Sequence, residues 1–198
     1  KALLADAAVF LYGTTRATNG IVERKIARTA FLTTAGFPDV LLLKEGGKAE
    51  PHNLEMEYPD PYIPRRLTFE VPERINAEGG VETVFDEDAV RALLAEFPKR
   101  NIEAIAVCLL WSIANPDHEL RVGKLIEEFV PGVPYTLSHQ LNPILREYRR
   151  ASSTAIDASL KPLMQEHLVT LQSDLRTAGY DNDILVSTSF GGVMHLAD

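Results

Sequence analysis

Residues 104–110, Ala-Ile-Ala-Val-Cys-Leu-Leu, form an unbroken apolar run near the middle of the chain. A short run with no polar residue is typical of a strand that is buried on both faces. Such strands lie at the centre of parallel sheets, because the crossover connections between parallel strands place helices on both faces. The run therefore predicts a mainly parallel sheet covered by helices. Trp111, directly after it, is expected in the core or in the wall of a cleft.

Short apolar runs and helical patterns alternate along the rest of the chain. The run at 9–12 predicts a second buried strand, and further strands are predicted at 29–33, 133–137 and 184–190. Helices are predicted at 17–25, at 39–44, at 87–97 after an Asp86 cap, after Asn115 as a cap with Pro116 at the first position, and over 144–178 with a bend at Pro162. This order predicts an α/β fold.

Residues 67–85 predict an antiparallel hairpin next to the parallel sheet. The first strand is predicted at 67–75, where Leu67, Phe69 and Val71 alternate with polar residues, and Pro72 places this strand at an edge or a bulge. Two glycines, Gly79 and Gly80, then turn the chain into a second strand at 81–85. The preceding segment, 45–66, has several glycines and prolines and no periodic pattern, which is often the mark of a functional loop.

Composition excludes several classes of protein. The single cysteine, Cys108, rules out an internal disulfide, and its place in the apolar run predicts a core residue rather than a nucleophile. A net charge of −8 argues against a nucleic-acid-binding protein, whose binding face would be basic. The apolar runs are too short to span a membrane and the start of the chain has no signal-peptide pattern, so we expect a cytoplasmic location.

Two segments place small or polar residues directly after a predicted strand, where they could bind a ligand. Residues 13–19 (GTTRATN) bring Thr14, Thr15, Thr18 and Asn19 to the start of a helix, where hydroxyl and N–H groups can hold an anion or a polarised carbonyl; helix capping is the alternative. Residues 189–193 (SFGGV) allow a ligand to approach the backbone closely at two glycines; an ordinary tight turn is the alternative.

Two further polar clusters have both structural and functional interpretations. Residues 115–119 (NPDHE) fit helix capping with surface acid at the positive end of a helix, and His118 and Glu119 lack the spacing of HExxH metal ligands. Arginines in 146–154 (REYRRASST) could grip a phosphate or carboxylate, or could form a solvated helix face in which Glu147 pairs with Arg150. The histidines are scattered, and no metal site is predicted.

The order of the motifs carries a resemblance over essentially the whole chain. They are GTTRATNGIVERK, TAFLTTAGFPDVL, FEVPERI, IEAIAVCLLWSIANPDHE, REYRRASSTAIDASLKPLM and GGVM. In this order they resemble the hydantoinase A / 5-oxoprolinase family, which includes ATP-dependent N-methylhydantoinases, 5-oxoprolinases and subunits of acetone and acetophenone carboxylases.

The resemblance implies that the chain is the middle of a longer subunit with an actin-like (ASKHA-type) ATPase fold. A phosphate loop of the GxDVGGTFTD type is expected before residue 1, and a second, acidic Gly-Gly-Thr loop after residue 198. Residues 1–143 would then be the C-terminal part of the N-terminal hydantoinase/oxoprolinase domain. Residues 144–198 would be a linking helix and the start of the hydantoinase A domain. Without these loops, the chain alone is expected to be inactive.

The resemblance also implies chemistry in which ATP, with Mg²⁺, phosphorylates the oxygen of a carbonyl substrate. It assigns Thr14 and Thr15 to the catalytic site. It assigns substrate binding to Thr18 and Asn19, and, on the opposite wall of the cleft, to Phe190, Gly191 and Gly192. Family members often have Ser-Asn-Gly-Gly where this chain has Ser-Phe-Gly-Gly, so Phe190 replaces a polar amide by an aromatic ring.

Three functions are compatible with this resemblance. The first is a subunit of an ATP-dependent cyclic-amide hydrolase acting on a hydantoin or 5-oxoproline, and the second is a subunit of an ATP-dependent ketone carboxylase. The third is a non-catalytic assembly domain. The sequence Leu-Leu-Lys-Glu-Gly-Gly at 42–47 departs from the hydantoinase pattern and leans slightly towards the carboxylases. Both kinds of enzyme imply a hydantoinase B-type partner subunit.

Overall fold

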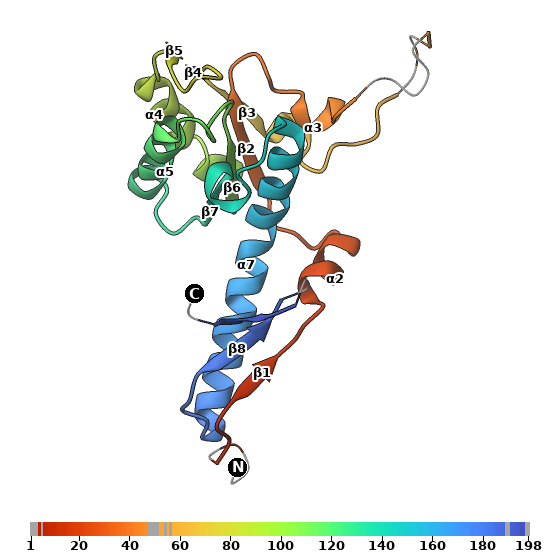
Figure 1. Ribbon diagram of the computed structural model, residues 1–198, viewed down its shortest axis with the longest axis vertical. Helices are drawn as coiled ribbons and strands as arrows, with labels where there is room; N and C mark the ends of the chain where they lie inside the picture. The colour runs from red at the N-terminus through yellow and green to blue at the C-terminus, as the bar shows by residue number, and fades with distance from the viewer. Residues whose placement is uncertain are drawn as a thin grey trace. The chain divides into compact units, whose positions relative to one another are not determined.

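The computed structural model describes residues 4, 6–46, 52, 53, 55, 57–188 and 191–196. The chain divides into two compact units, one of residues 27–161 and one formed by both ends of the chain, residues 1–26 and 162–198 (Figure 1). Helix α7 (Glu147–Ala178) contributes to both units, and Pro162 lies inside it. The helix begins three residues later than predicted and ends at Ala178, and the following Gly179 has a φ of +96°, the left-handed conformation of a C-terminal cap.

The larger unit is built on a four-stranded sheet in which every pair is parallel. In the order in which they pair, its strands are β3 (Thr68–Val71), β2 (Thr29–Thr34), β6 (Ala104–Cys108) and β7 (Tyr135–Leu137). Strand β6 pairs with β2 on one side and β7 on the other, and all its residues are buried. The prediction of a central parallel strand is therefore confirmed.

The order in which strands are added to this sheet reverses once, although all the strands are parallel. From β2 the chain moves outward to β3 on one side, then returns to β6 on the other side of β2 and continues to β7. The point between β2 and β6 is therefore a topological switch point. In open α/β sheets, ligands bind outside the carboxyl ends of the strands at such a point.

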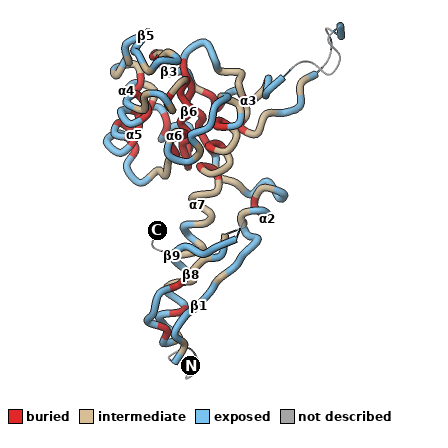
Figure 2. The backbone as a smooth tube through the Cα atoms, in the orientation of Figure 1, coloured by how far each residue is buried: buried red, intermediate tan, exposed pale blue. Residues whose placement is uncertain are grey.

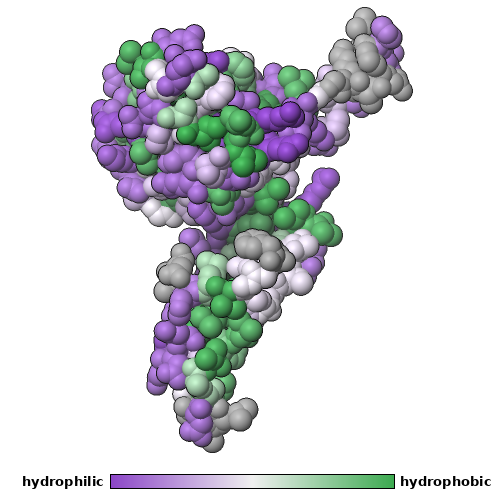
Figure 3. All heavy atoms as spheres, in the orientation of Figure 1, coloured by the Kyte–Doolittle hydropathy of each residue, from purple (hydrophilic) through white to green (hydrophobic). Residues whose placement is uncertain are grey.

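Helices cover both faces of this sheet. Figure 1 shows α4 (Glu87–Ala95) and α5 (Asp117–Phe129) on one side and the first part of α7 on the other. Their inward residues form one core with the strands, which Figure 2 shows as the buried centre of the unit. Hydrophilic side chains cover most of the outward face of α4 and α5 in Figure 3. No helix among the described residues is both long and apolar enough to cross a membrane.

Short elements complete the larger unit. They are α3 (Val40–Leu43), α6 (Ser138–Leu141) and two 3₁₀ turns, η1 (Arg65–Leu67) and η2 (Pro98–Arg100). The Asp86 carboxylate accepts a hydrogen bond from the N–H of Ala89 at 2.9 Å, which confirms the predicted cap of α4. Helix α5 begins at Asp117, one residue later than predicted, and Asn115 Oδ1 accepts a hydrogen bond from the Asp117 N–H at 3.0 Å.

The hairpin predicted over 67–85 is wrong in its first strand. Residues 68–71 form β3, which pairs parallel with β2 at the edge of the main sheet. The antiparallel pair is a separate, smaller one between β4 (Arg74–Ile75) and β5 (Val81–Thr83). Pro72 has no N–H to continue a ladder, so the single strand expected from the alternation is interrupted there.

The smaller unit contains a three-stranded sheet in the order β1 (Phe10–Tyr12), β8 (Ile184–Ser187), β9 (Val193–His195). Strand β1 is parallel to β8, and β9 is antiparallel to it. The expectation that β1 is buried is wrong, because Leu11 is 59% exposed. Within the part of the chain that the structure describes, one face of the strand is covered, where the Phe10 ring lies 5.7 Å from the Tyr180 ring.

Candidate functional site

The smaller unit contains a cavity of about 380 Å³ next to the segment that connects β1 to helix α2 (Arg16–Val22). Three of the predicted site residues, Thr14, Thr15 and Asn19, line it together, whereas Thr18 is not among the lining residues. The other lining residues come from β1, from α2 and the turn after it, and from α7: Tyr12, Arg16, Gly20, Glu23, Lys25, Leu163 and His167. The cavity thus combines hydroxyl, amide and charged groups.

The two threonines have different local roles. Thr14 Oγ1 accepts a hydrogen bond from the Arg16 N–H at 3.1 Å, which supports the capping interpretation for this residue. Thr15 occupies the N-cap position of α2, yet its side chain makes no capping hydrogen bond. Its hydroxyl is therefore available to a molecule in the cavity.

Charged and aromatic groups surround these hydroxyls. The Lys25 ammonium lies 2.6 Å from a Glu23 carboxylate oxygen, and this hydrogen bond and ion pair lower the pKa of Glu23. Tyr12 Oη and His167 Nε2 are 2.6 Å apart, which links β1 to α7 on the cavity wall. Arg16 adds a second cation to the lining. Because Glu23 balances the charge of Lys25, the Arg16 guanidinium and the free Thr15 hydroxyl are the groups that suit an anionic or polarised oxygen.

The predicted glycines lie in the turn between β8 and β9 and do not line this cavity. Gly191 and Gly192 have φ values of +89° and +99°, which glycine adopts without strain. The Thr188 hydroxyl donates to the Gly191 carbonyl at 2.8 Å, a contact typical of a tight turn. Phe190 lies outside the described residues, and the assignment of all three to substrate binding stays a prediction.

A buried polar network in the larger unit was not foreseen. Glu119, expected to be surface acid, is fully buried. Its Oε1 accepts hydrogen bonds from the Leu109 N–H at 2.8 Å and the Ser138 hydroxyl at 2.6 Å. Its Oε2 accepts from the His139 N–H at 3.1 Å and lies 2.6 Å from His139 Nδ1. The surface interpretation is therefore wrong, because Leu109, which follows β6, and two residues of α6 enclose the carboxylate.

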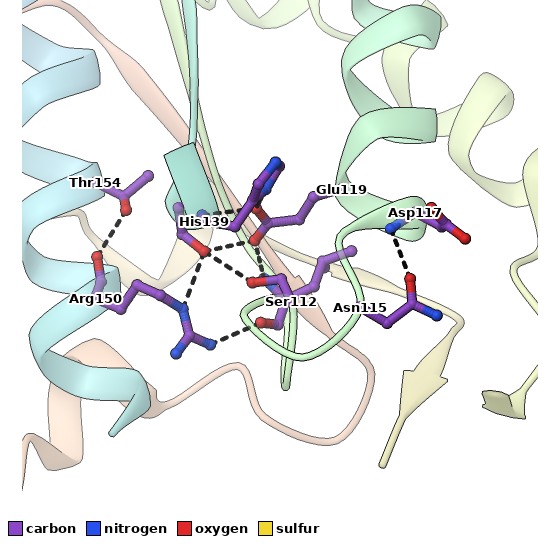
Figure 4. Close-up of polar contacts among 9 residues, drawn as sticks. Ser112, Asn115, Asp117, Glu119, His139, Arg150 and Thr154 are labelled. Atoms are coloured by element: carbon purple, nitrogen blue, oxygen red, sulfur yellow. Dashed lines mark hydrogen bonds and ion pairs between the residues drawn. The ribbon is translucent and has the colours of Figure 1, made fainter. Parts of the chain in front are cut away.

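Arg146 and Arg149 are exposed, as the solvated interpretation of the arginine cluster predicted. Arg150 instead completes this network and contradicts both sequence interpretations. It is buried, and its guanidinium donates to the Leu109 carbonyl at 2.9 Å, the Ile144 carbonyl at 3.1 Å and the Ser138 hydroxyl at 3.1 Å. Figure 4 shows Arg150, Glu119 and His139 pointing toward one another. A guanidinium held in this way is neither solvated nor free to grip a ligand. Small residues follow Arg150 on α7, among them Ala151 and Ala155. They are buried in the core of the larger unit, where their small size allows α7 to approach the sheet closely.

A second carboxylate–histidine pair lies at the end of β2. Glu73 is buried, and its Oε2 lies 2.7 Å from His118 Nδ1. The Thr34 hydroxyl donates to the other Glu73 oxygen and accepts from the Leu110 N–H at 2.9 Å. The two networks therefore hold the backbone of consecutive residues, 109 and 110, directly after β6. The residues of each carboxylate–histidine pair are 20 or more positions apart in the sequence, so no local sequence pattern could predict the pairs.

Comparison with known proteins places this geometry in a family. Residues 4–130 match the family model of the hydantoinase/oxoprolinase N-terminal region. The chain is 29% identical to the caprolactamase subunit alpha of Pseudomonas jessenii and 34% identical to the acetophenone carboxylase gamma subunit of Aromatoleum aromaticum. Each match covers 96% of this chain and 28% of the relative.

The solved structures agree with the sequence relatives. The crystal structure of the ATP-dependent caprolactamase from Pseudomonas jessenii matches with a TM-score of 0.87 and 29% identity, over 96% of this chain and 28% of that one. The chain thus spans about 28% of the length of these relatives. The match over 4–130 confirms the resemblance carried by the motifs: the chain belongs to the hydantoinase/oxoprolinase family.

Proposed function

We propose that this chain is part of an ATP-dependent enzyme subunit with an actin-like fold that activates a carbonyl by phosphorylation and thereby hydrolyses a cyclic amide. Family membership and the likeness to an ATP-dependent caprolactamase support this function. The observation that carries it to specific residues is the cavity beside α2, where Thr14, Thr15 and Asn19 lie together. Thr18, Phe190, Gly191 and Gly192 remain part of the proposed substrate site.

The cavity residues have a defined part in this proposal. When bound, ATP would supply the phosphoryl group that makes the carbonyl oxygen a good leaving group. The Thr15 hydroxyl and the Asn19 amide would donate hydrogen bonds to an oxygen of the substrate or of the transferred group. Arg16 would place positive charge near the same oxygens, whereas the charge of Lys25 is balanced by Glu23.

The described residues do not fit a Mg²⁺ site. Glu23 is the carboxylate that lines the cavity, and it is engaged by Lys25. Nowhere in the described ranges do three His, Cys, Asp or Glu side chains cluster as metal ligands. We therefore derive no step through the metal from this chain. The proposal places Mg²⁺ and the phosphate loops in other parts of a longer subunit.

The remaining parts of the proposal concern organisation. Residues 1–143 would complete the N-terminal hydantoinase/oxoprolinase domain, and residues 144–198 would form a linking helix and the start of the hydantoinase A domain. These proposed domain boundaries differ from the boundaries of the two compact units, which lie at 26/27 and 161/162. The units are defined by contacts in space, whereas the proposed domains follow the family resemblance. A hydantoinase B-type partner subunit and a cytoplasmic location complete the proposal. The partner is supported by relatives that are themselves named as subunits.

The test is phosphate release from ATP by the full-length protein with its partner subunit. Hydantoin, 5-oxoproline and caprolactam are compared with acetone or acetophenone plus bicarbonate. Stimulation by a cyclic amide is expected, and Thr15→Ala should lower the stimulated rate about 10-fold or more, the effect of removing a hydrogen bond to developing charge. The matched control is Thr170→Ala, an exposed threonine of α7. ATP turnover with none of the compounds would favour a non-catalytic assembly domain.

One observation favours a second candidate, a subunit of an ATP-dependent ketone carboxylase. Identity to the acetophenone carboxylase gamma subunit is 34%, against 29% to the caprolactamase subunit. The same assay separates the two functions. Phosphate release that requires a ketone and bicarbonate together, with no response to cyclic amides, would replace hydrolysis by carboxylation.

A further inference from the structure

A cavity of about 590 Å³ lies in the larger unit, where β2 and β6 end. Thr33 of β2 and Cys108 of β6 line it, as does Trp111 just beyond β6. This is the switch point of the parallel sheet: β3 is added on the outer side of β2, whereas β7 is added on the outer side of β6. Ligands bind at this position in open α/β sheets. None of the predicted site residues lies in this cavity.

Two residues in the wall of this cavity have unfavourable backbone conformations. Trp111 and Lys44 both line it and both have left-handed backbone, with φ of +55° and +58°. Residues other than glycine persist in this conformation where the surrounding structure enforces it, and such positions cluster at ligand sites. The Glu119 and Glu73 networks supply the enforcement at Trp111, because they fix the two residues before it.

The lining combines apolar surface with charge of both signs. Phe37, Leu43 and Trp111 offer apolar and aromatic surface, and the Arg74 guanidinium lies 4.9 Å from the centre of the Phe37 ring. Asp39 is already neutralised by Arg65, whose Nε donates to its Oδ1 at 2.8 Å. In the described part of the chain, Lys44 and Glu147 line the cavity without an ion-pair partner.

We infer that this cavity binds a free amino acid with an apolar or aromatic side chain. The side chain would lie against Phe37 and Trp111, the carboxylate would face Lys44, and the ammonium would face Glu147. Arg74 is already paired with Glu82, whose carboxylate oxygen lies 3.8 Å from its Nε. A zwitterion satisfies both unpaired charges at once, whereas a simple carboxylic acid or a simple amine leaves one of them open. The cysteine in the wall takes no covalent part, because burial raises the pKa of the Cys108 thiol to about 12. The inference does not depend on the proposed function.

Binding to the full-length protein, measured by isothermal titration calorimetry without ATP, tests this inference. The ligands are L-phenylalanine and L-leucine, with 3-phenylpropionate and phenethylamine as compounds that lack the ammonium or the carboxylate. The amino acids should bind at least about 10-fold more tightly than either comparator. Glu147→Gln should remove most of this advantage over 3-phenylpropionate, and Lys44→Gln most of the advantage over phenethylamine.

The controls distinguish binding in this cavity from a general effect of charge on the helix and from loss of folding. Glu166→Gln changes an exposed carboxylate on the same helix and should leave binding unchanged. Thermal melts of all variants should stay within a few degrees of the parent, since Lys44 and Glu147 make no ion pair within the described residues and an acidic residue in the first turn of a helix contributes only about 0.3–1 kcal/mol. The inference is overturned if no amino acid binds at millimolar concentration. It is also overturned if Glu147→Gln leaves binding unchanged, which would assign Glu147 only to stabilising the start of α7.

Discussion

Glu119→Gln is expected to destabilise the larger unit strongly, although it changes one atom. The carboxylate accepts from two backbone N–H groups, one hydroxyl and the His139 ring, and it is fully buried. Glutamine keeps one acceptor oxygen and turns an NH₂ group toward donors that it cannot satisfy. It also removes the negative charge that lies near the buried Arg150 guanidinium, with the Ser138 hydroxyl between them.

The magnitude follows from these contacts. An unsatisfied buried donor costs about 1–3 kcal/mol, and two donors face whichever carboxylate oxygen the NH₂ group replaces. We expect the free energy of unfolding to fall by about 3–5 kcal/mol. Urea unfolding followed by the fluorescence of Trp111, the single tryptophan, reports on this region because residues 109 and 110 are held by the two networks.

The control is Glu128→Gln, which makes the same chemical change on the exposed face of α5. It should alter the free energy of unfolding by less than about 0.5 kcal/mol. If Glu119→Gln destabilises the protein no more than this control, the carboxylate is not the acceptor that holds Leu109 and His139, and the reasoning about the network fails.

Three further predictions concern other parts of the chain. The Cys108 thiol, with its pKa raised to about 12 by burial, should resist alkylation at pH 8 in the native protein and react once urea unfolds it; rapid native labelling counts against the buried position. Gly13→Ala would place a Cβ 2.9 Å from Ser187 Oγ and should lower the melting temperature by no more than a few degrees, because the serine side chain can rotate; Ser187→Ala should remove this loss, and a loss that persists in the double variant contradicts the contact with Ser187. Burial, followed by the hydrogen bond to Glu127, raises the pKa of Tyr135 to about 12. The folded state therefore holds this proton more tightly than the unfolded one, so its contribution to stability is complete below about pH 10 and lost as the pH rises through 12. A spectrophotometric titration should show one tyrosine that ionises near pH 12, and Glu127→Gln should lower the pH at which this tyrosine ionises.

The elements that local patterns determine were predictable from the sequence. Strand β6 follows from its unbroken apolar run, and the start of α4 from Asp86 before a helical pattern. Local patterns failed where burial depends on distant partners. The pattern in 9–12 resembles that of a buried strand, yet only one face of β1 has a neighbour in the smaller unit.

The candidate sites divide in the same way. The grouping of Thr14, Thr15 and Asn19 follows from their position between a strand and a helix. The networks of Glu119 and Glu73 could not be predicted, because each histidine partner comes from a separate element that only the fold brings near. Charged residues in amphipathic segments were interpreted as surface, since most charged residues are exposed. Arg150 shows that a charged residue on a small-residue helix face can instead be a core residue.

The two ends of the larger unit meet. The Ala27 N–H donates to the Ser159 carbonyl at 3.0 Å, so the chain enters and leaves this unit at neighbouring points. Residues 27–161 are therefore arranged as an insert, which a gene could gain, lose or exchange with only two adjacent joins. The exit join falls inside α7, but Pro162 has no N–H and already leaves out one helical hydrogen bond there. A cut at this point severs the helix where its backbone ladder is weakest, which makes 27–161 a natural segment to excise or to permute circularly.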